Sequence, residues 1–99
     1  RIGVIRHPET RYKALPDVVA CDRGGEAALL DLRTSRYFGL NAVGSLVWTS
    51  LSEPASPNVL AEIVASRFEV EKPRAEADIR ALLDQLEAEG LVTRVEADA

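Results

Sequence analysis

The chain has 99 residues, 46% of them hydrophobic, and a formal net charge of −4. This length and composition suit one globular domain and exclude a disordered chain. No apolar run reaches the roughly 20 residues that a membrane span needs. The single cysteine, Cys21, cannot form an internal disulfide, which favours a reducing compartment, so we expect a cytoplasmic protein.

The N-terminal segment is basic and contains Pro8 and Pro16. It has no clear hydrophobic period beyond a short apolar stretch. We therefore predict an arm over residues 1–17, with a possible edge strand at Ile2 to Ile5, and a folded domain over residues 18–99.

Three short strands follow the arm. The stretches VVAC and EAALLDL flank the turn sequence DRGG, whose glycines allow a tight reversal, so residues 18–32 predict a β-hairpin. The polar turn RTS then leads into a third strand, RYFGL, at residues 36–40. Short strands joined by tight turns predict an antiparallel meander.

Three helices are predicted after the strands. Asn41 is the expected N-cap of the first, and Ser56-Pro57 starts a second that runs to about Phe68. Pro73 opens a third, and Gly90 ends it as a left-handed cap. A short strand or an extended tail, LVTRVE, completes the chain. The predicted fold is α+β: a three-stranded antiparallel sheet followed by three helices, in a winged-helix-like arrangement.

No catalytic or metal site is evident in the sequence. Cys21 and His7 are the only cysteine and histidine, no supporting motif joins them, and zinc needs three or four ligands. The acidic residues of the third helix are those of an ordinary solvated helix face. We therefore expect no enzymatic activity and no cofactor.

The ordered features of the chain resemble the PqqD-like family of leader-peptide recognition elements. The strand ends in Leu29-Leu30-Asp31, a polar turn follows, and RYFGLN at residues 36–41 leads into the helix that begins Ala42-Val43-Gly44. The resemblance covers residues 18–95 and is greatest to the stand-alone leader-binding protein of lasso-peptide pathways. Lys72 before Pro73 departs from the pattern, because the family often has an acidic cap there.

This resemblance implies a function in peptide recognition. Such proteins bind the leader of a ribosomally made precursor as an antiparallel strand added to the third strand, in the cleft beside the third helix. In lasso pathways a separate cysteine protease then cleaves the leader, and a cyclase acts on the core peptide. We accordingly expect the precursor leader peptide, the protease and possibly the cyclase as partners, and neither nucleic acid nor membrane. We expect a monomer.

The candidate leader-binding residues lie in the third strand and on the third helix. Phe38 and Leu40 share one face of the strand and are expected in the core. The remaining candidates either line the cleft or are simply exposed; they are Arg36, Tyr37, Gly39, Asp78, Ala81, Leu82 and Gln85.

Two alternatives remain open from the sequence. A winged-helix nucleic-acid-binding domain is the first, although acidic residues outnumber basic ones from Glu69 onward and would repel phosphates. The second is a dimerisation domain in which the open strand edge pairs with its own copy. Asp31 either pairs with Arg33 or Arg36, or simply starts the turn.

Overall fold

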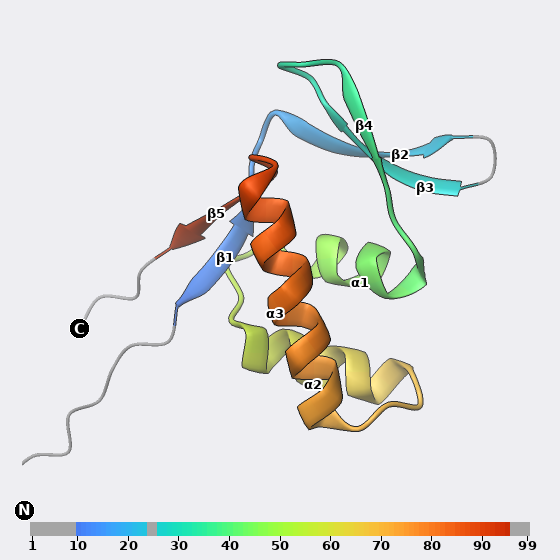
Figure 1. The fold of residues 1–99 in the computed structure, drawn as a ribbon, viewed down its shortest axis with the longest axis vertical. Coiled ribbons are helices and arrows are strands. Elements are labelled where there is room, and N and C mark those ends of the chain that lie inside the picture. The colour runs from blue at the N-terminus through green and yellow to red at the C-terminus, as the bar shows by residue number, and fades with distance from the viewer. Residues whose placement is uncertain (1–9, 24–25, 96–99) are drawn as a thin grey trace, which may run out of the picture.

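The structure is a computed structural model that describes residues 10–23 and 26–95. Figure 1 shows one helix along the length of the molecule, with a small sheet at one end and a second helix at the other. In chain order the elements are β1 (Arg11–Ala14), β2 (Val18–Arg23), β3 (Glu26–Asp31), β4 (Arg36–Gly39), α1 (Ala42–Ser50), α2 (Pro57–Arg67), α3 (Lys72–Ala88) and β5 (Val92–Val95).

The strands form two antiparallel sheets. One has the order β2-β3-β4 and the other pairs β1 with β5. The predicted meander and the α+β class are therefore confirmed. In Figure 1 the meander lies over α1 and beside the C-terminal end of α3.

Local side-chain and backbone bonds set the ends of the helices. The side chain of Asn41 accepts the amide of Gly44 at 2.8 Å, and that of Ser56 accepts the amide of Val59 at 3.2 Å. Both predicted N-caps are confirmed. α3 begins at Lys72, one residue before the predicted start at Pro73, and its N-cap is the acidic Glu71, which makes no side-chain cap bond.

The C-terminal end of α3 is a Schellman motif. Gly90 has a φ of 76°, its amide donates to the Glu87 carbonyl at 3.0 Å, and the Leu91 amide donates to the Leu86 carbonyl at 2.9 Å. Both leucines are buried in the same core cluster, so an apolar contact accompanies the reversed backbone. The predicted left-handed cap at Gly90 is confirmed.

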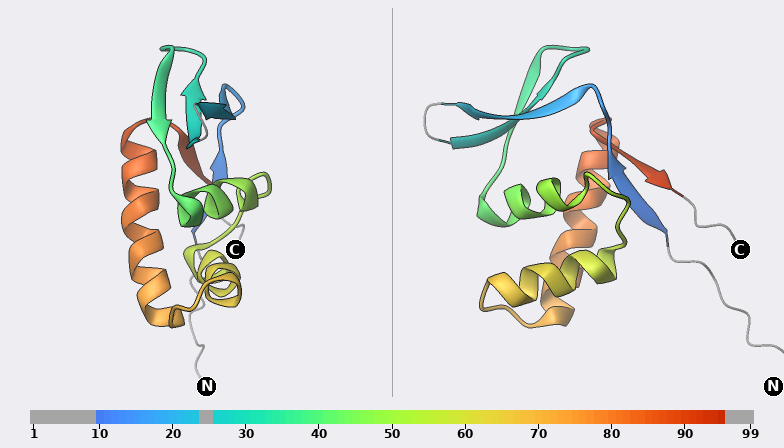
Figure 2. Two further views of the ribbon diagram at one scale, coloured as in Figure 1. Left: turned by 90° about the vertical axis from the view of Figure 1, so that its right-hand side faces the viewer. Right: turned by 180° about the vertical axis from the view of Figure 1, so that it is seen from behind.

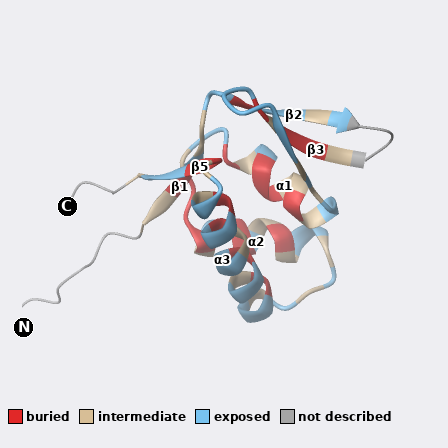
Figure 3. Ribbon diagram, turned by 45° about the horizontal axis from the view of Figure 1, so that its top comes forward, coloured by how far each residue is buried: buried red, intermediate tan, exposed pale blue. Residues whose placement is uncertain are grey.

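The core lies where the three helices meet each other and the inner faces of the sheets. Figure 3 shows the buried residues along β3 and on the facing sides of the helices. Cys21 is only half-buried. The largest fully buried side chains are Leu29, Val47, Leu51, Leu60, Ile79, Leu83 and Leu91.

The prediction of an arm over residues 1–17 is wrong for its last part. β1 pairs with β5, and Tyr12 is buried within the core cluster. Figure 2 shows these two strands side by side, near the C-terminal end of α3. The physical reason is that β5 offers a pairing partner, and the Tyr12 ring gains burial by joining it.

Some expectations fall outside the described residues. The possible edge strand at Ile2 to Ile5 lies there, as do the two glycines of the β2–β3 turn. Among the helices that the structure describes, none is long and apolar enough to cross a membrane.

Candidate functional site

β4 is the end strand of the meander. Only β3 pairs with it in the described part of the chain. The Leu40 amide donates to the Ala27 carbonyl at 2.9 Å, so this pair is hydrogen-bonded. Because such pairs alternate along an antiparallel ladder, Phe38 also bonds toward β3, and the backbone groups of Gly39 point to the side away from it.

The two faces of β4 have different surroundings. Phe38 and Leu40 are half-buried and pack against the core, as predicted. Tyr37 and Gly39 occupy the opposite face, where the Tyr37 side chain is 45% exposed. A Cβ added at Gly39 would meet nothing within 4 Å, so neither packing nor an unusual backbone demands glycine here. A glycine within a strand is typical of a place where another backbone approaches closely.

α3 presents a buried face and a second flank beside it. Ile79, Leu83 and Leu86 are buried, as predicted. On the flank, Leu82 is half-buried against the core. The three other candidates on this flank are exposed, and they are Asp78, Ala81 and Gln85.

A pocket of about 280 Å³ lies between the start of α1 and α3, just beyond the end of β4. Asp78 and Leu82 of the predicted set line it, whereas Ala81, Gln85 and the predicted residues of the third strand do not. Its remaining lining residues are Asn41, Val43, Gly44 and Ile79.

Gly44 matters to the shape of this pocket. A Cβ at this position would come within 3.2 Å of the Leu40 Cδ2 atom and 3.3 Å of the Asn41 Oδ1 atom. Both distances are shorter than ordinary van der Waals contact, so glycine lets the capping side chain and Leu40 close over the start of α1.

Contacts at its two ends align β4 with α3. The Arg36 guanidinium, at the start of β4, lies 3.9 Å from the Glu89 carboxylate and 5.3 Å above the Phe38 ring. At the other end, Asn41 shares the pocket with Asp78 and Leu82. β4 therefore runs antiparallel to α3. The left panel of Figure 2 shows both on the same side of the molecule.

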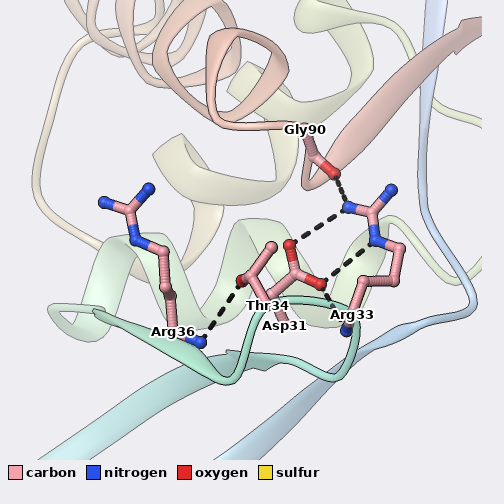
Figure 4. A network of polar contacts seen from close by, with 5 residues as sticks. All are labelled: Asp31, Arg33, Thr34, Arg36 and Gly90. Atoms are coloured by element: carbon pink, nitrogen blue, oxygen red, sulfur yellow. Dashed lines mark hydrogen bonds and ion pairs between the residues drawn. The ribbon is translucent and has the colours of Figure 1, made fainter.

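A polar network links the β3–β4 turn to the end of α3 (Figure 4). The carboxylate of Asp31, which is 2% exposed, accepts the backbone amide of Arg33 at 2.9 Å and its Nε and Nη2 atoms at 3.1 Å each. The Arg33 Nη2 atom also donates to the Gly90 carbonyl at 2.6 Å. Asp31 pairs with Arg33 and not with Arg36, and it also starts the turn, because its carbonyl accepts the amides of Thr34 and Ser35 at 3.3 and 2.7 Å.

The electrostatics of this network follow from its hydrogen bonds. Donation from the Arg33 side chain holds the pKa of Asp31 below its ordinary value of 3.8, although burial acts in the opposite direction. The same bond raises the pKa of Arg33. Both groups are therefore charged across the physiological range.

The described residues contain no group of three or more histidine, cysteine or acidic side chains that could hold a metal ion. α3 carries no net positive charge, because its four acidic residues (Glu76, Asp78, Asp84 and Glu87) outnumber its three basic ones (Lys72, Arg74 and Arg80). A helix that carries this charge is poorly suited to approach a phosphate backbone.

The sequence reasoning missed several residues that shape this region. Asn41 was predicted only as a cap and Ile79 only as core, yet both line the pocket. A glycine inside a helix is costly, so Gly44 was a usable signal. No local pattern pointed to the contacts of Glu89 or Gly90 with the strand region, because they join segments far apart in the chain.

Comparisons with known proteins agree on one family. Residues 26–92 match the family described as Coenzyme PQQ synthesis protein D (PqqD). The chain is similar to the solved structure of a lasso peptide synthetase B1 complexed with the leader peptide, at 30% identity and a TM-score of 0.71, over 83% of this chain and 96% of that one. It is also similar to TbiB1 in complex with the TbiA(beta) leader peptide, at 35% identity and a TM-score of 0.72, over 87% of this chain and 99% of that one. No curated protein matches the chain.

Proposed function

The chain belongs to the PqqD family, and from that membership we propose that it is a non-catalytic module that binds the leader of a lasso-type precursor peptide. Two similar proteins have been solved with leader peptides. The observation that carries the proposal for this chain is the end strand β4, whose last residue, Gly39, turns its backbone groups to the open edge.

The leader adds to β4 as an antiparallel strand. Backbone groups of Gly39 face the side on which it docks, so main-chain hydrogen bonds supply affinity. Gly39 carries no side chain that would hold the incoming backbone away. Arg36, Tyr37, Phe38 and Leu40 flank the added strand on its two faces.

The proposed antiparallel pairing implies a direction for the leader. β4 runs antiparallel to α3, so a strand antiparallel to β4 runs parallel to α3. Its N-terminal part then lies near the pocket of Asn41 and Leu82, and its C-terminal part leaves near Arg36 and Glu89.

The exposed flank of α3 determines which side chains of the leader fit beside β4. The pocket of about 280 Å³ has room for one apolar side chain, which Leu82 would contact. Asp78 lies at its polar rim, and Ala81 and Gln85 lie farther along the exposed flank. The core peptide, which follows the leader, is presented to a separate cysteine protease and then to a cyclase from the end marked by Arg36.

A titration with a labelled leader tests this function. The probe is the synthetic leader of a precursor encoded beside the gene of this protein, with the TbiA(beta) leader as a second probe. We expect saturable binding with amide chemical-shift changes along residues 36–40. Absence of such changes with every leader tried would rule out the proposed function.

The direction of the leader has its own measurement. A spin label at the N-terminus of the leader should broaden the amide of Gly44, and a label at its C-terminus should broaden that of Glu89. The reverse pattern would mean that the leader docks parallel to β4.

A further inference from the structure

The β3–β4 turn is attached to the end of α3 by the Arg33 side chain. Arg33 precedes β4 by three positions and reaches across to Gly90, at the end of α3. Figure 4 shows its guanidinium between the Asp31 carboxylate and the Gly90 carbonyl. One side chain thus joins two segments that are 57 residues apart in the chain.

Asp31 makes this attachment rigid. It is nearly fully buried, and its carboxylate accepts three bonds from Arg33. A planar guanidinium that donates through Nε and Nη2 to one carboxylate has a set orientation. That orientation aims the second bond of Nη2 at the Gly90 carbonyl.

The acceptor at the other end is equally well defined. The Schellman motif turns the backbone at Gly90 and satisfies the Leu86 and Glu87 carbonyls within the helix end. The Gly90 carbonyl lies beyond that motif and accepts from Arg33 at 2.6 Å. A cation is also favourable at this position, because the C-terminal end of a helix carries partial negative charge.

Arg36 supplies only a weak parallel contact. Its guanidinium is 3.9 Å from Glu89, and the side chains are 67% and 36% exposed, so water screens the pair. The alignment of the first residue of β4 with α3 therefore depends mainly on Arg33.

We propose that Asp31 and Arg33 are positioning residues for leader binding: they hold the start of β4 against the end of α3 before the peptide arrives. This inference rests on the proposed function. Neither residue contacts the leader. Instead, they keep the binding edge and the specificity flank of α3 in one arrangement, so that the leader does not bear the cost of ordering them.

The kinetics separate positioning from direct contact. Without the contact from Asp31 through Arg33 to Gly90, only a fraction of the free molecules has β4 in the arrangement that binds the leader. The apparent affinity for the leader then falls by that fraction. Arg33→Ala should therefore slow association of the labelled leader, for a loss in affinity of roughly tenfold, while dissociation stays near the wild-type rate. Gln85→Ala, on the proposed contact flank, should instead speed dissociation.

Two further variants separate the role of the Arg33 guanidinium from general effects of losing an arginine. Arg33→Lys keeps a cation beside Asp31 but not the planar fork, so it should fold and still associate more slowly than wild type. Arg80→Ala is the matched control, because it removes an arginine of α3 whose partner is Glu76 and which lies outside the pocket and the β4 edge.

Hydrogen exchange in the free protein tests whether Arg33 holds β4 in place before any leader binds. The amides of Phe38 and Leu40, which bond toward β3, should exchange faster in Arg33→Ala than in wild type and in Arg80→Ala, relative to the amides of β1. If they exchange at the wild-type rate, or if wild type binds a leader and Arg33→Ala binds it with equal affinity, the positioning role is overturned. Failure of wild type to bind any leader would instead count against the proposed function.

Discussion

β1 and β4 are short strands that differ in whether backbone partners cover both of their edges. On one side β1 pairs with β5. On the other, Tyr12 exchanges backbone bonds with Ala55 at 2.8 and 3.0 Å, and the Ala14 amide donates to the Leu51 carbonyl at 3.1 Å. In the described residues β4 pairs only with β3.

The difference separates a structural strand from one that can accept a ligand. An open edge is a hazard unless it is covered or used, and β1 is covered by the connection between α1 and α2. β4 is short and carries Arg36 at its start, which limits uncontrolled pairing. The closed edge supports the fold, and we attribute leader binding to the open one.

The largest expected contrast is between the tyrosines of the two strands. Tyr12 is buried against the core and lies under the Arg94 guanidinium at 5.6 Å. Tyr12→Ala should lower the free energy of unfolding by about 3–5 kcal/mol. Tyr37→Ala should lower it by only about 1 kcal/mol and should weaken leader binding. Urea denaturation and leader titration measure the two effects, and equal destabilisation by both variants would contradict the comparison.

Proline substitutions break the two edges in different ways. The bond from the Leu15 amide to the Leu91 carbonyl sets the register of β1, so the Lys13 amide faces β5. Lys13→Pro should cost about 1–3 kcal/mol of stability, because it removes that donor. Gly39→Pro removes a donor that β3 does not use, so the protein should stay folded and lose at least about a hundredfold in leader affinity. Circular dichroism melts and fluorescence anisotropy check the two outcomes. A Gly39→Pro variant that binds the leader with wild-type affinity would contradict strand addition at β4.

The smallest effect is expected from pH and concerns the turn that precedes β4. The pKa of Asp31 is lowered in the folded state, mainly by the Arg33 side chain, so its ionised form stabilises the fold above its ordinary value of 3.8. That contribution is lost as the pH falls below 3.8 through the folded-state pKa. Asp31→Asn should flatten this part of the acid limb of the stability curve, as measured by urea denaturation at pH 5 and pH 3. An equal loss of stability between these two pH values in wild type and in Asp31→Asn would contradict this contribution of Asp31.

The sequence predicted the elements that local chemistry decides. The caps at Asn41, Ser56 and Gly90 could be predicted because each depends on neighbours within a few residues. The alternation of Phe38 and Tyr37 between the core and the outer face followed from strand geometry alone.

Long-range partners decided what the sequence did not predict. β1 carries no apolar period, and its place in the core depends on pairing with β5 at the far end of the chain. The contact of Arg33 with Gly90 likewise joins distant segments. The pocket depends on how closely α1 approaches α3, which packing sets.

Amide hydrogen exchange with and without bound leader tests the central claim most directly. The account predicts that leader binding slows exchange of the Gly39 amide, which faces the open edge, and leaves the Lys13 amide of the closed edge unchanged. Saturating binding with no added protection at Gly39, or with protection appearing along β1 instead, would contradict strand addition at β4.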